Sequence, residues 1–482
     1  MKKILLLLTL GVGTIHVFAQ TPCVNGFAGQ YPCNGYDLMA HMSAAELTGD
    51  PTASGNDSWG WTDPDTGKEY AIIGLSTATA FVDISDPVNP VYLGRVETET
   101  FDSSWRAIRV QNNHVFIVAD AAGDHGMQVF DLKRLRNVTT PQVFTRDALF
   151  SDVGSCHTIT IDETKPYAYL MGCENYNGGP VFVDISNPLN PTEAGGYGDS
   201  GYTHDGQIVT YHGPDTTYTG RDILVACNGS FGSNNKVVFL DVTDKSNPVL
   251  ISELTYDNPG YTHQSWLTED HQYSLLGDEL DEMDFGFNSK TLVMDVRDLD
   301  NPTILSEYFG PTEAIDHNGF VKGNKFYLAN YTAGIRVLDV TNVASPTNAL
   351  TEIGFFDTYP QNNVAEFDGV WSVYPFFESE NIVISDISGG FFLVRKSETM
   401  GTNELTANSI QIIPNPANDF VQIKTNNQQK LESVKLINTV GKEVFSKNKI
   451  NQTNFQIDVS NLPTGVYIVK INNSISKKLL VK

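Results

Sequence analysis

The chain has 482 residues, of which 40% are hydrophobic and 18% charged, and its formal net charge at pH 7 is −26. This much apolar sequence can build a large core, which excludes an intrinsically disordered protein. The acidic balance excludes a nucleic-acid-binding protein, because recognition of phosphates requires a basic face. At about 150 residues per domain, the length predicts two or three domains, or one large β-architecture with attachments.

The first 19 residues have the pattern of a signal peptide. Lys2 and Lys3 form a basic start, an apolar run follows to about Ile15, and Val17-Phe18-Ala19 resembles a cleavage site. No later segment approaches 18 uninterrupted apolar residues. We therefore expect a mature, exported chain from Gln20 onward, without a transmembrane helix.

Residues 20–35 form a Gly-rich segment with little apolar sequence to hold it in place. Cys23 and Cys33 bracket this segment, and export to an oxidising compartment permits disulfides. A disulfide between Cys23 and Cys33 is the natural pairing. The chain has five cysteines, so at least one remains unpaired or has another use.

One phrase recurs through residues 36–396: an apolar strand that ends in a charged residue, a turn, and a second strand that often begins with Pro. The copies are spaced by about 50 residues, and each holds four candidate strands, a repeat length typical of propeller blades. The sequence therefore predicts an all-β fold with a seven-bladed β-propeller. The residues that anchor the seven copies are Asp83, Asp131, Asp184, Asp241, Asp295, Asp339 and Arg395.

The seventh copy ends without an outer strand. The segment YDLMAHMSAAEL at residues 36–47, which precedes the first copy, resembles the missing strand. We expect it to complete the seventh blade, because closure of the ring covers two sheet edges that would otherwise promote aggregation.

The repeated phrase resembles the LVIVD repeat. Longer stretches, including GYTHDGQIV, GYTHQSWLTED, GFFDTYP and WSVYPFF, are similar to the choice-of-anchor B family of exported bacterial proteins. That resemblance implies a shared body that carries different surface-anchoring tails, and it implies no particular reaction.

The C-terminal part is a separate module. A polar linker at residues 397–408 precedes residues 409–482, which contain IIPNPANDFVQI, VKLINTVGKEV and LPTGVYIVKI and are rich in Lys. Alternating strands with Asn, Gly and Pro turns predict a small β-sandwich. The segment resembles the type A C-terminal sorting domain of the type IX secretion system of Bacteroidetes. This resemblance implies handling by the type IX machinery and a location in the medium or on the outer-membrane surface.

Aligning the first strand of every blade places seven side chains at one structural position, at the mouth of the channel. The second strands end on the same face with carboxylates and amides. The aligned first-strand residues are Trp59, Trp105, His157, His204, His263, His317 and Phe367, and the second strands end at Asp120, Glu174, Asn228, Asp278, Glu279, Asn330 and Asp386.

Four consecutive blades thus offer imidazoles, which we call the histidine cluster (His157, His204, His263 and His317). Imidazole is the commonest metal ligand, so the cluster could hold zinc, copper or iron, beside an aromatic wall typical of a ligand pocket. The alternative is that these imidazoles line the channel and hydrogen-bond between blades, by descent from a common repeat. Carboxylates orient such ligands by accepting the second N–H, a role predicted for Asp120, Glu174, Asp278 and Glu279.

The acidic loop at residues 277–288, GDELDEMDFGFN, is the densest group of charges. Its carboxylates could hold calcium, although the spacing of an EF-hand is absent, or they could form a solvated loop. The acidic residues are Asp278, Glu279, Asp281, Glu282 and Asp284.

Cys156 begins the first strand of blade three and Cys173 ends the second, so the two residues should lie side by side. A cross-strand disulfide is expected, with Cys227 as the odd thiol. Because Cys156 adjoins His157, a metal-ligand role for Cys156 stays open.

The sequence contains no nucleophile elbow, phosphate loop or dinucleotide fingerprint. The interpretation that we favour is a secreted or surface-exposed propeller whose channel-mouth face binds an unidentified extracellular ligand or partner. The alternative is a metal-dependent extracellular enzyme, an oxidoreductase or a hydrolase, that uses the four histidines.

Overall fold

The computed structural model describes residues 20–482 except for 233, 398–409, 426–429, 439–440 and 473–474. The predicted signal peptide and residues 398–408 of the predicted linker lie outside the described residues. The chain divides into two compact units, Met1–Ser397 and Glu398–Lys482, which we call the large and the small unit. Among the described residues, no helix is long and apolar enough to cross a membrane.

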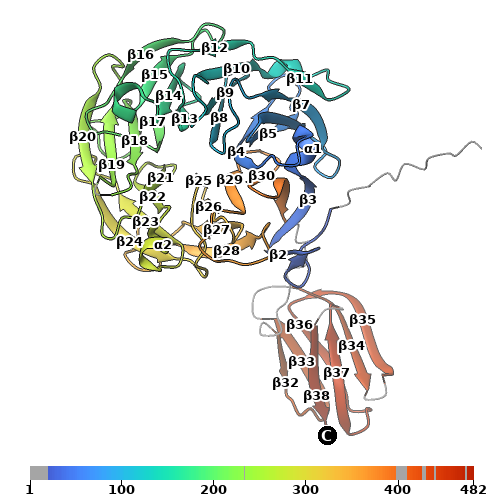
Figure 1. Ribbon diagram of the computed structural model, residues 1–482. Helices are drawn as coiled ribbons and strands as arrows, with labels where there is room; N and C mark the ends of the chain where they lie inside the picture. The colour runs from blue at the N-terminus through green and yellow to red at the C-terminus, as the bar shows by residue number, and fades with distance from the viewer. Residues whose placement is uncertain (1–19, 233, 398–409, 426–429, 439–440, 473–474) are drawn as a thin grey trace, which may run out of the picture. The chain divides into compact units, whose positions relative to one another are not determined.

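The described part of the large unit folds into seven sheets that follow one another around a ring (Figure 1). Each sheet contains a run of four antiparallel strands, as the repeat predicts. We number the sheets 1 to 7 in the chain order of their first strands. The all-β, propeller-like arrangement agrees with the sequence interpretation.

Sheets 1 to 4 take their strands from consecutive chain segments. Sheet 1 contains β4 (Gly55–Thr62), β5 (Glu69–Leu75), β6 (Ala78–Asp83) and β7 (Val91–Glu97). Sheet 2 contains β8 (Arg106–Gln111), β9 (His114–Ala119), β10 (Met127–Asp131) and β12 (Ala148–Phe150). Sheet 3 contains β13 (Thr158–Ile161), β14 (Tyr167–Met171), β15 (Val181–Asp184) and β16 (Thr192–Gly196). Sheet 4 contains β17 (Asp205–Thr210), β18 (Asp222–Asn228), β19 (Lys236–Asp241) and β20 (Val249–Leu254).

Sheets 5 to 7 complete the ring. Sheet 5 contains β21 (Thr262–Leu267), β22 (Tyr273–Asp278), β23 (Lys290–Asp295) and β24 (Thr303–Phe309). Sheet 6 contains β25 (Gly319–Lys322), β26 (Lys325–Ala329), β27 (Ile335–Asp339) and β28 (Thr351–Phe356). Sheet 7 contains β29 (Val370–Tyr374), β30 (Asn381–Asp386), β31 (Gly390–Lys396) and β3 (Tyr36–Met42). Among the described residues, four short helices connect strands: α1 (Ala44–Thr48), η1 (Leu132–Leu135), η2 (Asn175–Gly178) and α2 (Asp281–Phe285).

The recurring Asp of the repeat shapes the turn that follows the third strand of a sheet. In sheet 3, the Asp184 carboxylate accepts a hydrogen bond of 2.8 Å from the backbone N–H of Ser186, two residues later. Asp339 makes the same bond with Thr341 in sheet 6. A side chain that bonds its own backbone two residues on stabilises a tight turn, which explains why the repeat requires Asp there.

The hydrophobic core lies between neighbouring sheets. The second strands are buried along their whole length in sheet 1 (β5) and in sheet 4 (β18). Both faces of such a strand are covered by adjacent sheets, so the sequence is a continuous apolar run rather than an alternating one.

The N-terminal segment closes the ring. Strand β3 pairs antiparallel with β31, with Leu38 opposite Val394, and thereby supplies the outer strand of sheet 7. The preceding hairpin, β1 (Phe27–Ala28) and β2 (Tyr31–Asn34), pairs with the outer strand of sheet 6. The predicted disulfide between Cys23 and Cys33 is confirmed and lies in this segment.

One strand differs from the repeat pattern. The second copy of the repeated phrase is VFDLKRLRNVTTPQVF, at residues 129–144. The phrase predicts that residues near Gln142–Phe144 form the outer strand of the same sheet. Instead, β11 (Gln142–Phe144) pairs in parallel with β7 of sheet 1, and β12 takes the outer position of sheet 2. The long insertion that contains η1 carries the chain past its own sheet before it returns.

The small unit contains two sheets around a separate core. One sheet has β32 (Ile410–Ile413), β33 (Phe420–Thr425) and β36 (Asn454–Asp458). The other has β35 (Glu443–Gln452), β34 (Leu431–Asn438), β37 (Gly465–Ile471) and β38 (Ile475–Val481). Inward residues such as Val421, Val434 and Val469 alternate with exposed ones, so each sheet buries one face.

Candidate functional site

The residues that line a narrow inner cavity include seven side chains, one for each sheet, that lie in the first strand of the sheet or one or two residues before it. Its volume of about 20 Å³ suits a single ion or water, because about 10–15 Å³ is the minimum for one water. These seven residues are Asp57, Trp105, His157, His204, His263, His317 and Trp371.

The histidine cluster is continuous across sheets 3 to 6. The ring centroids of His157 and His204 are 4.1 Å apart, those of His204 and His263 are 4.6 Å apart, and those of His263 and His317 are 4.1 Å apart. The structure thus brings together all four imidazoles that the repeat alignment places at one position.

Glu279, which follows β22, points its carboxylate at the histidine cluster. Its Oε2 lies 3.7 Å from Nε2 of His263, and its Oε1 lies 3.5 Å from Nε2 of His317. Ligand atoms of His204, His263 and Glu279 all lie within 4.8 Å of one another, a spacing that one metal ion can bridge. In this geometry the Glu279 carboxylate could contact a bound metal directly, whereas the sequence interpretation gave it an orienting role.

Polar partners hold three of the four imidazoles through Nδ1. His157 donates to Oδ2 of Asp120 at 2.9 Å, and His317 donates to the Trp371 carbonyl oxygen at 2.7 Å. Nδ1 of His204 lies 3.1 Å from the Tyr261 hydroxyl. Nδ1 of His263 has no hydrogen-bond partner among the described residues. Occupied Nδ1 atoms leave Nε2 as the atom available for a metal.

Burial keeps three imidazoles of the cluster, those of His204, His263 and His317, uncharged. Removal from water lowers the pKa of His204 and His263 well below the ordinary value, and neighbouring imidazoles lower both further. Burial likewise lowers the pKa of His317 to about 3. Burial raises the pKa of Glu279 to about 7. Neutral imidazoles are the metal-binding form, so these three rings need no deprotonation at pH 7.

An outer pocket of about 460 Å³ lies above the cluster. Its lining is dominated by aromatic side chains, and it shares Trp105 and Trp371 with the inner cavity. Tyr331 donates a hydrogen bond of 2.8 Å to Oε1 of Glu279, which joins the pocket wall to its polar floor. The lining residues include Trp105, Phe231, Tyr261, Glu279, Leu280, Tyr331, Phe367 and Trp371.

Two aromatic positions of the predicted ring are wrong. The sequence alignment selected Trp59 and Phe367, but the inner cavity is lined by Asp57 in sheet 1 and Trp371 in sheet 7. Register shifts between Gly55 and Ser58 and between Val370 and Ser372 displace the alignment by a few residues.

The carboxylates that were predicted to orient the histidines lie in different environments. Asp120 lies where the prediction places it, against His157. Glu174 is exposed at the start of η2. Asp278 is buried, and its carboxylate accepts from the Tyr256 hydroxyl at 2.6 Å and the Tyr261 N–H at 2.7 Å.

Charged residues that the sequence interpretation did not single out line the lower part of the inner cavity. Nη1 of Arg109 lies 3.0 Å from Oδ2 of Asp57, and Ser372 donates to Oδ1 of Asp57 at 2.8 Å. Burial raises the pKa of the nearby Asp205 to about 6. The stretch SSWRAIRV carried a signal for Arg106 and Arg109, because arginines are unusual in the innermost strand of a buried sheet.

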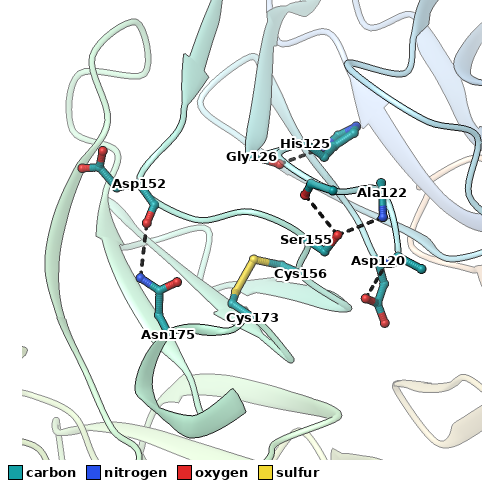
Figure 2. The surroundings of a disulfide bond; sticks show 11 residues. Asp120, Ala122, His125, Gly126, Asp152, Ser155, Cys156, Cys173 and Asn175 are labelled. Atoms are coloured by element: carbon teal, nitrogen blue, oxygen red, sulfur yellow. Dashed lines mark hydrogen bonds between the residues drawn. A yellow bond between two sulfur atoms is a disulfide. The ribbon is translucent and has the colours of Figure 1, made fainter.

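The second predicted disulfide, between Cys156 and Cys173, is confirmed (Figure 2). It joins the residue before His157 to the end of β14, so a metal-ligand role for Cys156 is wrong. Ser155 accepts a hydrogen bond of 2.8 Å from the Ala122 N–H, which ties this loop to the one that carries Asp120 (Figure 2). Cys227 is the free, buried thiol.

Family comparisons agree with both parts of the sequence interpretation. Residues 411–482 match the secretion system C-terminal sorting domain, and residues 69–98 and 174–199 match the LVIVD repeat. The chain thus carries LVIVD repeats and a type IX sorting domain. Such a domain indicates export to the cell surface or into the medium in Bacteroidetes.

Similar solved structures include two large bacterial proteins. PorZ, a surface component of the type IX secretion system of Porphyromonas gingivalis, is 14% identical with a TM-score of 0.44, over 86% of this chain and 58% of PorZ. The chain therefore spans little more than half the length of PorZ. Hydrazine synthase of Kuenenia stuttgartiensis is 12% identical with a TM-score of 0.49, over 68% of this chain and 92% of that one. No curated protein matches the sequence.

Proposed function

We propose that the chain is an exported, seven-bladed β-propeller of the choice-of-anchor B type, closed by β3 and followed by a C-terminal β-sandwich. Its function in this proposal is to bind a small extracellular ligand in the outer pocket. The observation that carries the proposal is the aromatic lining of this pocket above a polar floor. Pockets of about 300–1,000 Å³ with apolar walls and few polar groups are typical of small-molecule sites.

The pocket chemistry favours a ligand with a planar or apolar body and one polar end. Aromatic walls from Phe231, Tyr261 and Phe367 would contact the body, and Glu279 would meet the polar end. Phe231 and Phe367 are substantially exposed, so part of the binding free energy would come from covering them.

A neutral fluorescent probe with an aromatic body and one polar N–H group, N-phenyl-1-naphthylamine, tests the pocket. We expect one probe per chain, and at least about tenfold weaker binding in a Phe231→Ser/Phe367→Ser variant. The matched control is Val143→Ser, which removes an exposed apolar side chain of β11 that does not line the pocket. Unchanged binding in the double variant would refute the pocket as a binding site. Displacement of the probe by soluble glycans and aromatic acids would then identify the ligand class.

The second candidate function is a metal-dependent extracellular enzyme, an oxidoreductase or hydrolase. Its support is that the histidine cluster lines a cavity of ionic size, and that the Glu279 carboxylate lies 3.7 Å from Nε2 of His263 and 3.5 Å from Nε2 of His317. These residues fit zinc, copper or iron, since imidazole and carboxylate are ligands that all three accept. A metal held there would act as a Lewis acid or redox centre at the floor of the outer pocket.

Elemental analysis of the exported chain after reconstitution discriminates between the two functions. One equivalent of zinc, copper or iron, lost in a His204→Ala/His263→Ala variant, would support the metal centre. Absence of stoichiometric metal from the wild-type chain would refute the enzyme proposal. That result would leave the ligand-binding proposal intact, because the probe experiment does not depend on a metal.

A further inference from the structure

The outer pocket combines aromatic walls with a single acidic group. Six of the twelve residues that line it are aromatic, and Glu279 is the one Asp or Glu among them. None of the twelve, all of them described residues, is Lys, Arg or His. Arg106 and Arg109 line the inner cavity instead. The lining of the outer pocket thus offers aromatic faces and one carboxylate, and no basic group.

The aromatic side chains stand at angles to one another and form adjoining walls. Tyr331 meets Phe367 with ring centroids 5.7 Å apart and an interplanar angle of 88°. Tyr331 also meets Trp371, at 6.1 Å and 85°. The rings of Phe231 and Tyr261 are 5.2 Å apart and tilted by 46°. Rings that meet edge to face turn their faces in different directions, so more than one π-face borders the pocket.

The Glu279 carboxylate keeps one oxygen free. Its Oε1 accepts the hydrogen bond of 2.8 Å from the Tyr331 hydroxyl, and its Oε2 accepts no hydrogen bond from any described residue. The basic atoms that face it are Nε2 of His263 and Nε2 of His317. Burial lowers the pKa of both rings, so neither is positively charged at pH 7. No described lysine or arginine forms an ion pair with Glu279. The carboxylate therefore has a free acceptor and lacks a cationic partner among the described residues.

A cation in the pocket would stabilise the ionised form of Glu279. Burial raises the pKa of this side chain to about 7, because removal from water disfavours the carboxylate. A nearby positive charge has the opposite effect. Glu279 belongs to the acidic loop, and the interpretation of that loop as solvated is wrong for Asp278, Asp281 and Glu282, which are buried.

We propose, on the basis of the ligand-binding function proposed above, that the outer pocket binds an organic cation: an ammonium group that carries methyl or other apolar substituents. Aromatic faces attract such a cation through the ring quadrupole, and the Glu279 carboxylate supplies the opposite charge. A bare ammonium group is strongly hydrated and needs hydrogen bonds that aromatic walls do not supply. An anionic ligand would meet the Glu279 carboxylate without a Lys or Arg in the lining to hold it.

Competition against N-phenyl-1-naphthylamine on the chelator-treated full chain tests the proposal. The competitors are phenyltrimethylammonium, the uncharged 2-phenylpropan-2-ol, which has nearly the same shape, and the anionic benzenesulfonate. We expect phenyltrimethylammonium to displace the probe at a concentration at least about tenfold lower than 2-phenylpropan-2-ol, because a cation inside aromatic walls gains attraction that the neutral compound lacks. Benzenesulfonate should be the weakest competitor of the three.

Two variants separate the carboxylate from the aromatic walls. Glu279→Gln keeps the size of the side chain and removes its charge, so the preference for the cation over the uncharged compound should fall at least about fivefold. The matched control is Asp284→Asn, which removes one negative charge from an exposed residue of the same loop that does not line the pocket. It should keep the wild-type preference. Phe367→Leu keeps an apolar side chain without a π-face and should also reduce the preference for the cation.

The outcomes distinguish this inference from the function on which it rests. If N-phenyl-1-naphthylamine does not bind, the pocket itself is refuted as a binding site, and the cation with it. If the probe binds but 2-phenylpropan-2-ol or benzenesulfonate competes as well as phenyltrimethylammonium, the organic cation is overturned and the pocket stands. An equal loss of preference in Asp284→Asn would also count against a direct contact with Glu279. If Glu279→Gln does not fold, the comparison of the three competitors on the wild-type chain decides.

Discussion

Nη1 of Arg106 lies 3.3 Å from Nε2 of His125, and Nδ1 of the same ring donates to the Gly126 carbonyl oxygen at 2.9 Å. Both side chains are buried, and Arg106 lines the inner cavity. The arrangement fixes a neutral imidazole that accepts at Nε2, because a proton there would face a guanidinium.

This pair predicts acid sensitivity. Burial and the Arg106 charge lower the pKa of His125 to about 4, below the ordinary value of about 6.5. A depressed histidine pKa means that the unfolded chain binds the proton more tightly, so stability is lost as pH falls from about 6.5 to 4. We expect a loss of about 2 to 3 kcal/mol from this residue. Chemical unfolding at pH 7 and pH 4.5 should show a smaller pH difference in His125→Gln than in the wild type, and an equal difference would refute the assignment.

The histidine cluster predicts strong coupling between ligands. If His204 and His263 share a metal, each Ala replacement should weaken metal binding, and the double replacement should cost much less than the two single losses combined. Metal titration followed by calorimetry measures this. His271→Ala, which removes a buried imidazole outside the cluster, is the control. If the rings only line the channel, each replacement should destabilise additively by about 1 kcal/mol, and zinc, copper or iron should leave the melting temperature unchanged.

Ring closure predicts an unusual cost at one glycine. Gly390, at the start of β31, has φ +84°, and a Cβ atom there would lie 2.5 Å from the Ala44 backbone nitrogen and 2.7 Å from the Met42 carbonyl oxygen. Gly390→Ala should therefore destabilise the large unit by several kcal/mol. Gly67→Ala, at φ +70° with open space around it, should cost about 1 kcal/mol. Equal melting temperatures of the two variants would contradict close packing of β3 and α1 on β31.

The disulfide beside His157 predicts a measurable stability loss. Removing the Cys156–Cys173 bond, which spans 17 residues, should cost about 3 kcal/mol through the entropy of the unfolded chain. Thermal unfolding of Cys156→Ser/Cys173→Ser should show this loss. Cys227→Ala removes a buried thiol without a cross-link and should cost less. A double variant as stable as the wild type would show that the bond adds nothing to the fold.

The sorting domain predicts a change of location. Truncation from Asn408 onward should leave a folded large unit that stays in the periplasm, because residues 411–482 carry the export signal. Protease treatment of intact cells, with cell fractionation, measures this. Surface exposure of the truncated chain would contradict the sorting assignment, and degradation in the periplasm would contradict independent folding of the large unit.

Much of the architecture is predictable from the sequence because each copy of the repeat has the same residue type at the same turn. Asp184 and its counterparts reappear for one reason, a turn that needs a side-chain acceptor. The pairing partner of strand β11 escaped prediction, because parallel pairing with a strand of a neighbouring sheet leaves no mark in the local alternation of apolar and polar residues. The strand with which an inserted segment pairs is known only from the three-dimensional structure.

The candidate site is predictable in part. The four histidines stand at one position because the strands that carry them share a register. Trp371 was missed because the register of β29 shifts between Val370 and Ser372, and an alignment by sequence pattern does not register such a shift. Contacts between residues of neighbouring sheets leave no periodic pattern in the sequence of the strands that make them.

The pairing of β3 with β31 joins residues 36–42 to residues 390–396. Strand β3 therefore cannot take its place in sheet 7 until β31 is present, although β31 itself already pairs with β30. Until then the ring stays open, with an unpaired strand edge at each end, and high separation in sequence makes the final step slow. Ring closure thus requires a complete large unit, since a chain that ends before β31 cannot pair β3 and cannot close the ring.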